Sequence, residues 1–360
     1  MERATRVFRP AALIALSSAL AGVLIVAIAA APPGLGSTGT HASAGTGAAK
    51  AKKPKVIHNA CKKSAIDVPA CGVLWGLYAP EVPGAGHEVQ DYAAYEKLAG
   101  RRFDIIKNYV GWMPGHTFPN AQEVSLAGNG QRILDFSWTA ADFSTRAKIS
   151  YQSIANGTWD KSVILPEAQR LKKFPHKVFI DFNHEFDSKA QAGKGTPAQY
   201  VAAYRHIHTV MQNAGVHNVI WAWVTTSDVG HAAELAASYP GSAYVDWVGY
   251  DPYNFAQCRG QPWHTPYQTF QPFYHWLQTQ PGMRSKPIMF GEYASAPGAQ
   301  VTAWYAGVAS ALKRLPQVKA VMEWSDKYTS TCDFNLVNSP AASAGFAKSS
   351  VASYVTGIPN

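Results

Sequence analysis

Lys177-Val-Phe-Ile-Asp-Phe-Asn-His-Glu185-Phe-Asp187 is a short apolar run that ends in polar and acidic side chains. A run of this length predicts a buried strand. Side chains alternate along a strand, so we expect Asp181, Asn183 and Glu185 to share one face. Similar runs recur on both sides of it, at 71–78, 103–110, 132–138, 219–225, 245–250, 287–291 and 318–324, and with 177–183 they make eight.

Longer amphipathic stretches separate these runs, at 88–100, 162–174, 197–214, 266–279 and 300–314. Thr196-Pro197 and Thr265-Pro266 predict helix starts with Pro at the first helical position. Strands that alternate with helices indicate an α/β fold with a parallel sheet. Eight such units predict a closed (β/α)8 TIM barrel that forms a single catalytic domain. A doubly wound open sheet is the alternative, but no glycine-rich phosphate loop follows the first run.

The ends of these runs carry polar and aromatic side chains. In a (β/α)8 barrel the carboxyl ends of the strands form the functional mouth. Aromatic rings stack on the apolar faces of sugars, while amide, imidazole and hydroxyl groups bond sugar hydroxyls. We therefore predict a carbohydrate site whose substrate-binding residues are Asn183, His184, Tyr250, Tyr253, Trp112, Trp223 and Trp324.

Two glutamates, Glu185 and Glu292, follow the fourth and seventh runs. Paired carboxylates at one mouth are what glycoside hydrolysis requires, one protonated and one ionised. Glu185 leaves an apolar strand, which favours the acid/base role. Glu292 has Tyr293, Tyr250 or Tyr253 available to hydrogen-bond it, which favours the nucleophile role.

The first 60 residues differ in composition from the rest. Residues 1–31 combine a basic start with a long apolar run, which is typical of a secretory signal peptide or an N-terminal membrane anchor. Residues 32–60 are rich in Gly, Ala and Lys and predict a disordered linker before the domain at 61–360. We expect an exported, extracellular protein, whether or not the N-terminal segment is cleaved.

Charge and cysteine usage fit an exported chain. The net charge is +9, but residues 64–360 carry only +1, so we expect no nucleic-acid partner. The basic linker is either merely solvated or contacts anionic cell-envelope polymers. The four cysteines allow three pairings, of which we expect Cys61–Cys71 and Cys258–Cys332.

Three segments resemble glycoside hydrolase family 26, a retaining family dominated by β-mannanases. They are Tyr239–Asp251, His184-Glu185 and Lys286–Glu292. The resemblance implies that Glu185 is the acid/base, Glu292 the nucleophile, His184 a sugar hydrogen-bonder and Trp324 a subsite floor. Asp181 and Phe182 stand where the family has Arg-Pro, which indicates a different subsite wall.

The leading hypothesis is a secreted retaining hydrolase that degrades a β-linked polysaccharide, most similar to an endo-β-1,4-mannanase. A β-glucanase, a β-xylanase or a non-catalytic carbohydrate-binding pseudoenzyme are the alternatives. A metal-dependent hydrolase is disfavoured, because Ser188 stands where a zinc H-E-x-x-H motif needs histidine. We expect no metal and no cofactor, and a monomer.

Overall fold

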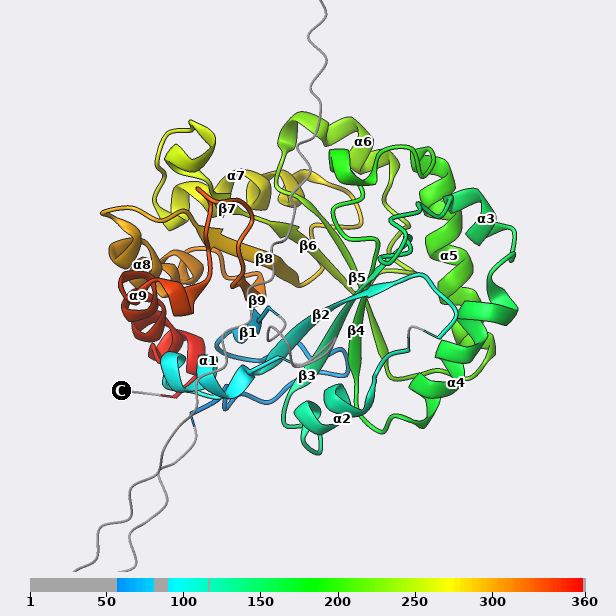
Figure 1. The fold of residues 1–360 in the computed structure, drawn as a ribbon, viewed down its shortest axis with the longest axis horizontal. Coiled ribbons are helices and arrows are strands. Elements are labelled where there is room, and N and C mark those ends of the chain that lie inside the picture. The colour runs from blue at the N-terminus through cyan, green and yellow to red at the C-terminus, as the bar shows by residue number, and fades with distance from the viewer. Residues whose placement is uncertain (1–56, 81–89, 116, 359–360) are drawn as a thin grey trace, which may run out of the picture. The chain divides into compact units, whose positions relative to one another are not determined.

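In a computed structural model of the protein, residues 57–80, 90–115 and 117–358 are described. Their strands form one parallel sheet of nine, drawn in Figure 1. All but the short β7 close into a barrel, because β1 pairs with both β2 and β9, and β6 pairs with β8. The strands are β1 Leu74–Tyr78, β2 Ile105–Gly111, β3 Ile133–Thr139, β4 Val178–Phe182, β5 Val219–Thr226, β6 Trp247–Asp251, β7 Tyr253–Asn254, β8 Ile288–Ser295 and β9 Val318–Trp324. The predicted (β/α)8 barrel is confirmed.

Helices surround the barrel, and the five longest stretches expected from the sequence are all present (Figure 1). Thr196 and Thr265 cap α5 and α7 as predicted, each in a capping box with a glutamine three residues later. The helices are α1 Tyr92–Ala99, α2 Ala121–Ala127, α3 Tyr151–Ala155, α4 Leu165–Lys173, α5 Pro197–Asn213, α6 Ala232–Ala237, α7 Pro266–Thr279, α8 Val301–Lys313, α9 Pro340–Ser350 and α10 Ser353–Thr356.

The barrel interior is apolar at its lower end. Buried side chains from the starts of the strands fill it, including Leu74, Phe179 and Trp247. Ile66 and Val68 pack against this cluster, and the Ile66 carbonyl accepts a hydrogen bond from the Trp247 indole at 2.8 Å. The segment before β1 therefore closes the amino-terminal end of the barrel, and function is left to the other end.

Both predicted disulfides, Cys61–Cys71 and Cys258–Cys332, are confirmed. The first lies under the barrel, where the amide of Ala60 donates to the carbonyl of Thr356 at 2.9 Å. The second joins the loops that follow β7 and β9 at the carboxyl end of the strands. The side-chain amide of Asn59, just before the predicted boundary at residue 61, donates to the carbonyl of Val73.

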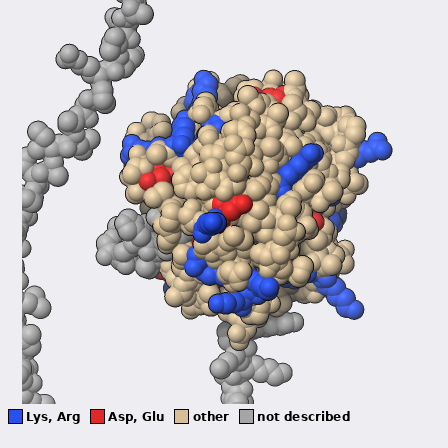
Figure 2. Space-filling model, turned by 90° about the vertical axis from the view of Figure 1, so that its right-hand side faces the viewer, with Lys and Arg blue, Asp and Glu red and all other residues tan. Residues whose placement is uncertain are grey.

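The predicted segment 1–31 and most of 32–60 lie outside the described residues. Within the described part, no helix has the length and apolar character needed to cross a membrane. On the face covered by α3, α4 and α5, Lys and Arg side chains are scattered among uncharged ones, as Figure 2 shows. No basic surface gathers on that face.

Candidate active site

Above the apolar floor, the barrel interior becomes charged at Lys107 of β2. Its ammonium group lies 3.1 Å from Asp135 Oδ2, 3.1 Å from Asp181 Oδ2 and 2.6 Å from Ser137 Oγ, and its side chain is fully buried. The two carboxylates raise the pKa of Lys107 against the opposing effect of burial. A buried lysine held between two aspartates is therefore charged, and it places a fixed positive charge beneath the mouth.

Glu292 reaches the mouth through an irregularity in β8. Met289 faces the barrel interior and Phe290 faces the helices, so strict alternation would direct Glu292 outward. The pairing of β8 with β9 shifts register between Phe290 and Tyr293, which returns Glu292 to the interior. Alternation of side chains alone would put Phe290 and Glu292 on the same face, and the bulge separates them.

Gly291 makes this bulge possible. A Cβ atom at this position would lie 2.6 Å from Val224 Cγ1 and 2.7 Å from Asp251 Oδ1. Asp251 Oδ1 instead accepts a hydrogen bond from the Glu292 amide at 2.8 Å. The absence of a side chain thus lets the backbone approach Asp251 closely and fixes the direction of Glu292.

Three side chains hold the Glu292 carboxylate. Tyr253 donates to Oε2 at 2.5 Å, Tyr109 donates to Oε1, and His184 Nε2 lies 3.2 Å from Oε1. Burial alone would raise the pKa of Glu292, but the His184 contact, the charge of Lys107 and the Tyr109 hydrogen bond outweigh it. Together they lower that pKa to about 2. Glu292 is therefore ionised and oriented.

Glu185 reaches the same mouth by a turn. β4 ends at Phe182, and Asn183 and Glu185 have positive φ angles of 51° and 48°. Within the described residues, no side chain donates a hydrogen bond to the Glu185 carboxylate. Burial, followed by the charge of Glu292, raises the pKa of Glu185 to about 7. The two glutamates interact electrostatically and have opposite protonation preferences.

His184 immediately precedes Glu185 in the chain, and its side chain contacts Glu292 in the mouth. Its Nε2 contacts Glu292, and its Nδ1 is buried with no hydrogen-bond partner among the described residues. Burial lowers the pKa of His184, but the hydrogen bond to Glu292 and the charge of Asp181 raise it overall. Its predicted contact with substrate stays a prediction, whereas its contact with Glu292 is an observation.

Trp324 lies at the mouth, as expected, at the end of β9. Its ring stacks on Tyr78 with the centroids 6.1 Å apart and packs edge-on against Tyr253 at 6.4 Å. It belongs to a group of rings that we call the aromatic shelf. The Cys258–Cys332 disulfide packs in the same cluster as these rings. The aromatic shelf comprises Tyr253, Phe255, Trp324, Tyr328 and Phe334. Tyr328 is 54% exposed, so part of this apolar surface faces solvent.

Four residues expected to bind substrate lie elsewhere. Tyr250 faces the helices and donates its hydroxyl to the Phe270 carbonyl at 2.7 Å. Trp223 donates to the carbonyl of Ser238, and Trp112 stacks on another buried tryptophan, with both rings fully buried. Asn183 is also fully buried and bonds Tyr151 and Lys194. These four assignments were wrong. Alternation directs Tyr250, Trp223 and Trp112 to the helix side of the sheet. At Asn183 the positive φ ends the alternation.

Tyr109, Asp251 and Lys107 were not predicted as site residues. A signal for Tyr109 exists: a lysine within an apolar strand must face a polar interior, and Tyr109 lies two residues beyond Lys107 on the same face. Asp251 is a charged residue at the end of β6, so the same argument directs its side chain to the polar interior. Charged residues inside strands are therefore better indicators of the mouth than aromatic residues at strand ends.

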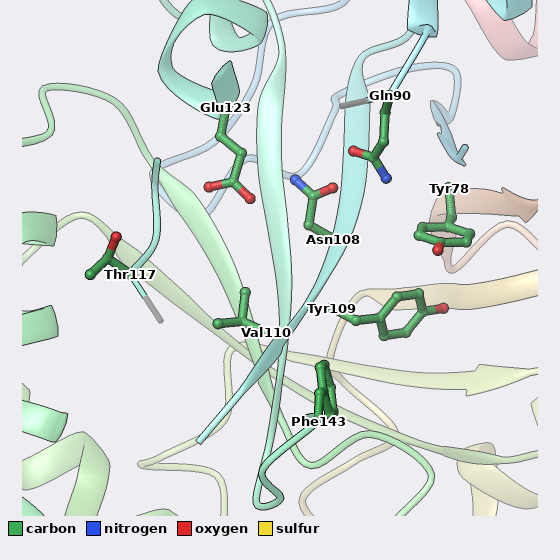
Figure 3. A pocket seen from close by; sticks show the side chains of 8 residues that line it. All are labelled: Tyr78, Gln90, Asn108, Tyr109, Val110, Thr117, Glu123 and Phe143. Atoms are coloured by element: carbon green, nitrogen blue, oxygen red, sulfur yellow. The ribbon is translucent and has the colours of Figure 1, made fainter. Parts of the chain in front are cut away.

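A pocket of about 200 Å³ lies beside Tyr109. Figure 3 shows Tyr78 and Tyr109 on one side of it, Glu123 and Thr117 on the other, and Phe143 at its edge. We call it the first pocket. It extends the site from Tyr109, which bonds Glu292, past the end of β2.

His184, Asp251 and Glu292 each bring one potential metal-ligand atom within 4.8 Å of the others. However, both oxygens of Glu292 already accept hydrogen bonds from tyrosines, and Asp251 Oδ1 accepts the Glu292 amide. These oxygens are therefore engaged in hydrogen bonds within the protein, and the three residues do not fit a metal site.

Comparison with known proteins bears on this site. Residues 186–275 match the sequence model of glycosyl hydrolase family 26, a segment that runs from just after Glu185 past β6 and β7 into α7. The chain is also 25% identical over 262 residues to Endoglucanase H of Acetivibrio thermocellus, covering 70% of this chain. The matched part is 28% of that longer relative.

Solved structures with the same fold include a family 26 β-mannanase from Bacteroides ovatus, with a TM-score of 0.58, 16% identity, and coverage of 78% of this chain and 89% of that one. An endo-β-1,4-mannanase catalytic domain from Bacillus sp. JAMB-750 gives a TM-score of 0.57 at 16% identity, over 79% and 86% of the two chains. At this identity the likeness shows the fold. The family model matches one segment of the chain, and over that segment, residues 186–275, the chain is similar to glycosyl hydrolase family 26.

Proposed function

We propose that the protein is an exported glycoside hydrolase that cleaves a β-linked polysaccharide with retention of configuration. The observation that carries the proposal is the difference in surroundings of two carboxyl groups at one mouth: Tyr109 and Tyr253 donate hydrogen bonds to Glu292, whereas no described side chain donates one to Glu185. Glu292 has a pKa lowered to about 2 and Glu185 a pKa raised to about 7. An ionised nucleophile beside a protonated acid is the pair that double displacement needs.

In the first step, a Glu292 oxygen attacks the anomeric carbon while Glu185 gives its proton to the leaving glycosidic oxygen. A glycosyl ester forms on Glu292 and the sugar on the leaving side departs. Glu185, now ionised, then takes a proton from a water molecule that attacks the same carbon, and the ester bond breaks. Both steps invert the carbon, so the product keeps its original configuration.

The hydrogen bonds to Glu292 indicate which oxygen attacks. A carboxylate offers about four lone-pair sites. Tyr109 and His184 occupy both sites on Oε1, whereas Tyr253 occupies one on Oε2. Oε2 therefore keeps a site for the anomeric carbon, and Tyr253 sets its direction.

The substrate we propose first is β-1,4-mannan, with endo cleavage, since the solved structures of this fold described above are mannanases by name. β-Glucan is the second candidate, because the curated relative is named an endoglucanase. The aromatic shelf supports a polymeric sugar substrate in either case, since sugar faces stack on rings.

The test is cleavage of mannan, lichenan, xylan and laminarin by the secreted protein, with proton NMR of the first-formed anomer. We expect reducing ends from mannan in the β configuration. First-formed α product would exclude the double displacement. Tight oligosaccharide binding without cleavage of any of the four polymers would instead favour a binding protein. Export is tested separately, by locating the protein in culture supernatant and membrane fractions.

A further inference from the structure

A second pocket, of about 410 Å³, adjoins the first. It lies between the loop that follows β3 and the segment 190–194 that follows Glu185. Phe143, which is 45% exposed, lines both pockets, and the first pocket includes the nucleophile contact Tyr109. The second pocket is therefore one aromatic ring away from the site where Glu292 is held.

Lys194 forms the buried wall of this pocket and is 2% exposed. Its ammonium group donates to Asn183 Oδ1 at 2.6 Å and to Gln191 Oε1 at 2.5 Å, both neutral amides. Within residues 57–80, 90–115 and 117–358, no carboxylate lies within ion-pair distance of it. Buried lysines are almost always paired with an acid, so this arrangement leaves a cation without its usual counterion.

Two further cations line the same pocket, Arg146 and Lys148, and both are exposed. Lys148 donates to the carbonyl of Ala192 at 2.6 Å. The carbonyl is neutral, so this contact does not balance the charge of Lys148. Burial, with the Lys148 charge, lowers the pKa of Lys194 to about 7. Repulsion between the two lysines means that a bound negative charge would stabilise both.

The acid in this pocket, Asp142, is committed to its own loop. Its Oδ1 accepts hydrogen bonds from the amide and hydroxyl of Ser144, and its Oδ2 accepts the hydroxyl of Thr145 at 2.5 Å. These bonds order the loop that carries Arg146 and Lys148. Because both oxygens of Asp142 are engaged within its own loop, it leaves the cationic character of the opposite wall intact.

We propose that this second pocket is a subsite for an anionic substituent of the glycan, with Lys194, Arg146 and Lys148 as its ligands. A carboxylate of an acidic sugar and a phosphate ester on a sugar present the same oxyanion chemistry. The inference rests on the proposed function, because it assigns a feature of the same polysaccharide substrate. Its consequence is that cleavage favours chains that carry acidic groups near the scissile bond.

The test is calorimetric binding of methyl β-D-glucuronide, glucose 6-phosphate and neutral methyl β-D-glucoside to the secreted protein. We expect at least one anion to bind tenfold or more tightly than the glucoside, and which one does identifies the source of the charge. We expect Lys194→Met to remove that preference. Equal binding of all three sugars, or a preference that survives Lys194→Met, would overturn the proposal.

Lys194→Met could disturb folding, since Lys194 also holds Asn183. The exposed pair Arg146→Ala and Lys148→Met therefore gives a second arm, expected to weaken anion binding at least tenfold with an unchanged melting temperature. Lys189→Met is the matched control, because Lys189 is exposed on the same segment but does not line the pocket. Anion binding that these variants leave unchanged, in a protein that still cleaves glycan, would reject the subsite alone. Absence of cleavage on every polymer would reject the proposed function.

Discussion

The hydroxyl of Tyr253 lies 2.5 Å from Oε2 of Glu292. The contact joins the short strand β7 to the bulge of β8, two elements that pair side by side. Tyr253 therefore links the aromatic shelf to the carboxylate, since its ring packs against Trp324 and its hydroxyl bonds Glu292. In the proposed mechanism, sugar stacking and the orientation of the nucleophile would therefore both depend on Tyr253.

Tyr253→Phe should lower kcat/KM by roughly 10- to 100-fold, since a hydrogen bond to a charged group contributes about 1.5–3 kcal/mol. The ring and its packing remain, so the melting temperature should change little. Tyr250→Phe is the control: it loses a hydrogen bond to the Phe270 carbonyl on the helix side, and activity should be kept. Equal losses in both variants would argue against a specific role for Tyr253.

Glu292→Gln should reduce kcat on the order of 10⁴-fold or more while the protein stays folded. The amide keeps the shape of the carboxyl group but cannot form the glycosyl ester. Initial rates on a cleaved polymer, with circular dichroism as the folding check, measure this. Residual activity above one hundredth of the parent rate would remove Glu292 from the nucleophile role.

Glu185→Gln should slow polymer cleavage by about 10²–10⁴-fold, the usual range for loss of a general acid. An aryl glycoside with a dinitrophenyl leaving group needs no proton, so its first step should be nearly unaffected. The comparison of the two substrates is the measurement. A similar loss on both would mean that Glu185 acts in some way other than protonating the leaving group.

The pH profile of kcat/KM should fall above about pH 7. Glu185 has its pKa raised to about 7, and its acid form, which the first step needs, is lost as the pH rises through that value. Glu292, with its pKa lowered to about 2, stays ionised throughout the neutral and mildly acidic range. In Glu292→Gln the repelling charge is gone, so direct titration of Glu185 should give a lower pKa than in the parent protein.

Lys107→Met should destabilise the fold by about 3–5 kcal/mol, because it leaves Asp135 and Asp181 buried without their shared cation. Denaturant unfolding measures the change. Lys173→Met, at an exposed position in the last turn of α4, is the control and should stay within about 0.5 kcal/mol. The destabilisation should shrink at low pH, where the two aspartates take up protons.

The strands could be predicted from the sequence because each is a buried apolar run bounded by helix signals. The starts of α5 and α7 could also be predicted, since a Thr-Pro pair marks each of them. The short helices α3, α6 and α10 were not, because five, six and four residues are too few to show a helical period. Local patterns thus fix the barrel but not all of its connections.

The two glutamates could be predicted from their position at strand ends, although the alternation of side chains does not account for the direction of either. Glu292 enters the mouth through a bulge at Gly291, and Glu185 through a turn with positive φ. Neither departure follows from alternation of side chains. Trp223 and Tyr250 were misplaced for the converse reason, because alternation holds in β5 and β6 and directs them to the helices.

The hydrogen bond from Ala60 to Thr356 brings the beginning and end of the domain together under the barrel, beside Ile66 and Val68. Every catalytic candidate lies at the opposite end of the strands. A resin or scaffold coupled through either end of the domain would thus attach at the amino-terminal side of the barrel. The mouth would stay open to long polymers. Coupling through surface lysines would lack this advantage, since Lys148 stands beside the cleft.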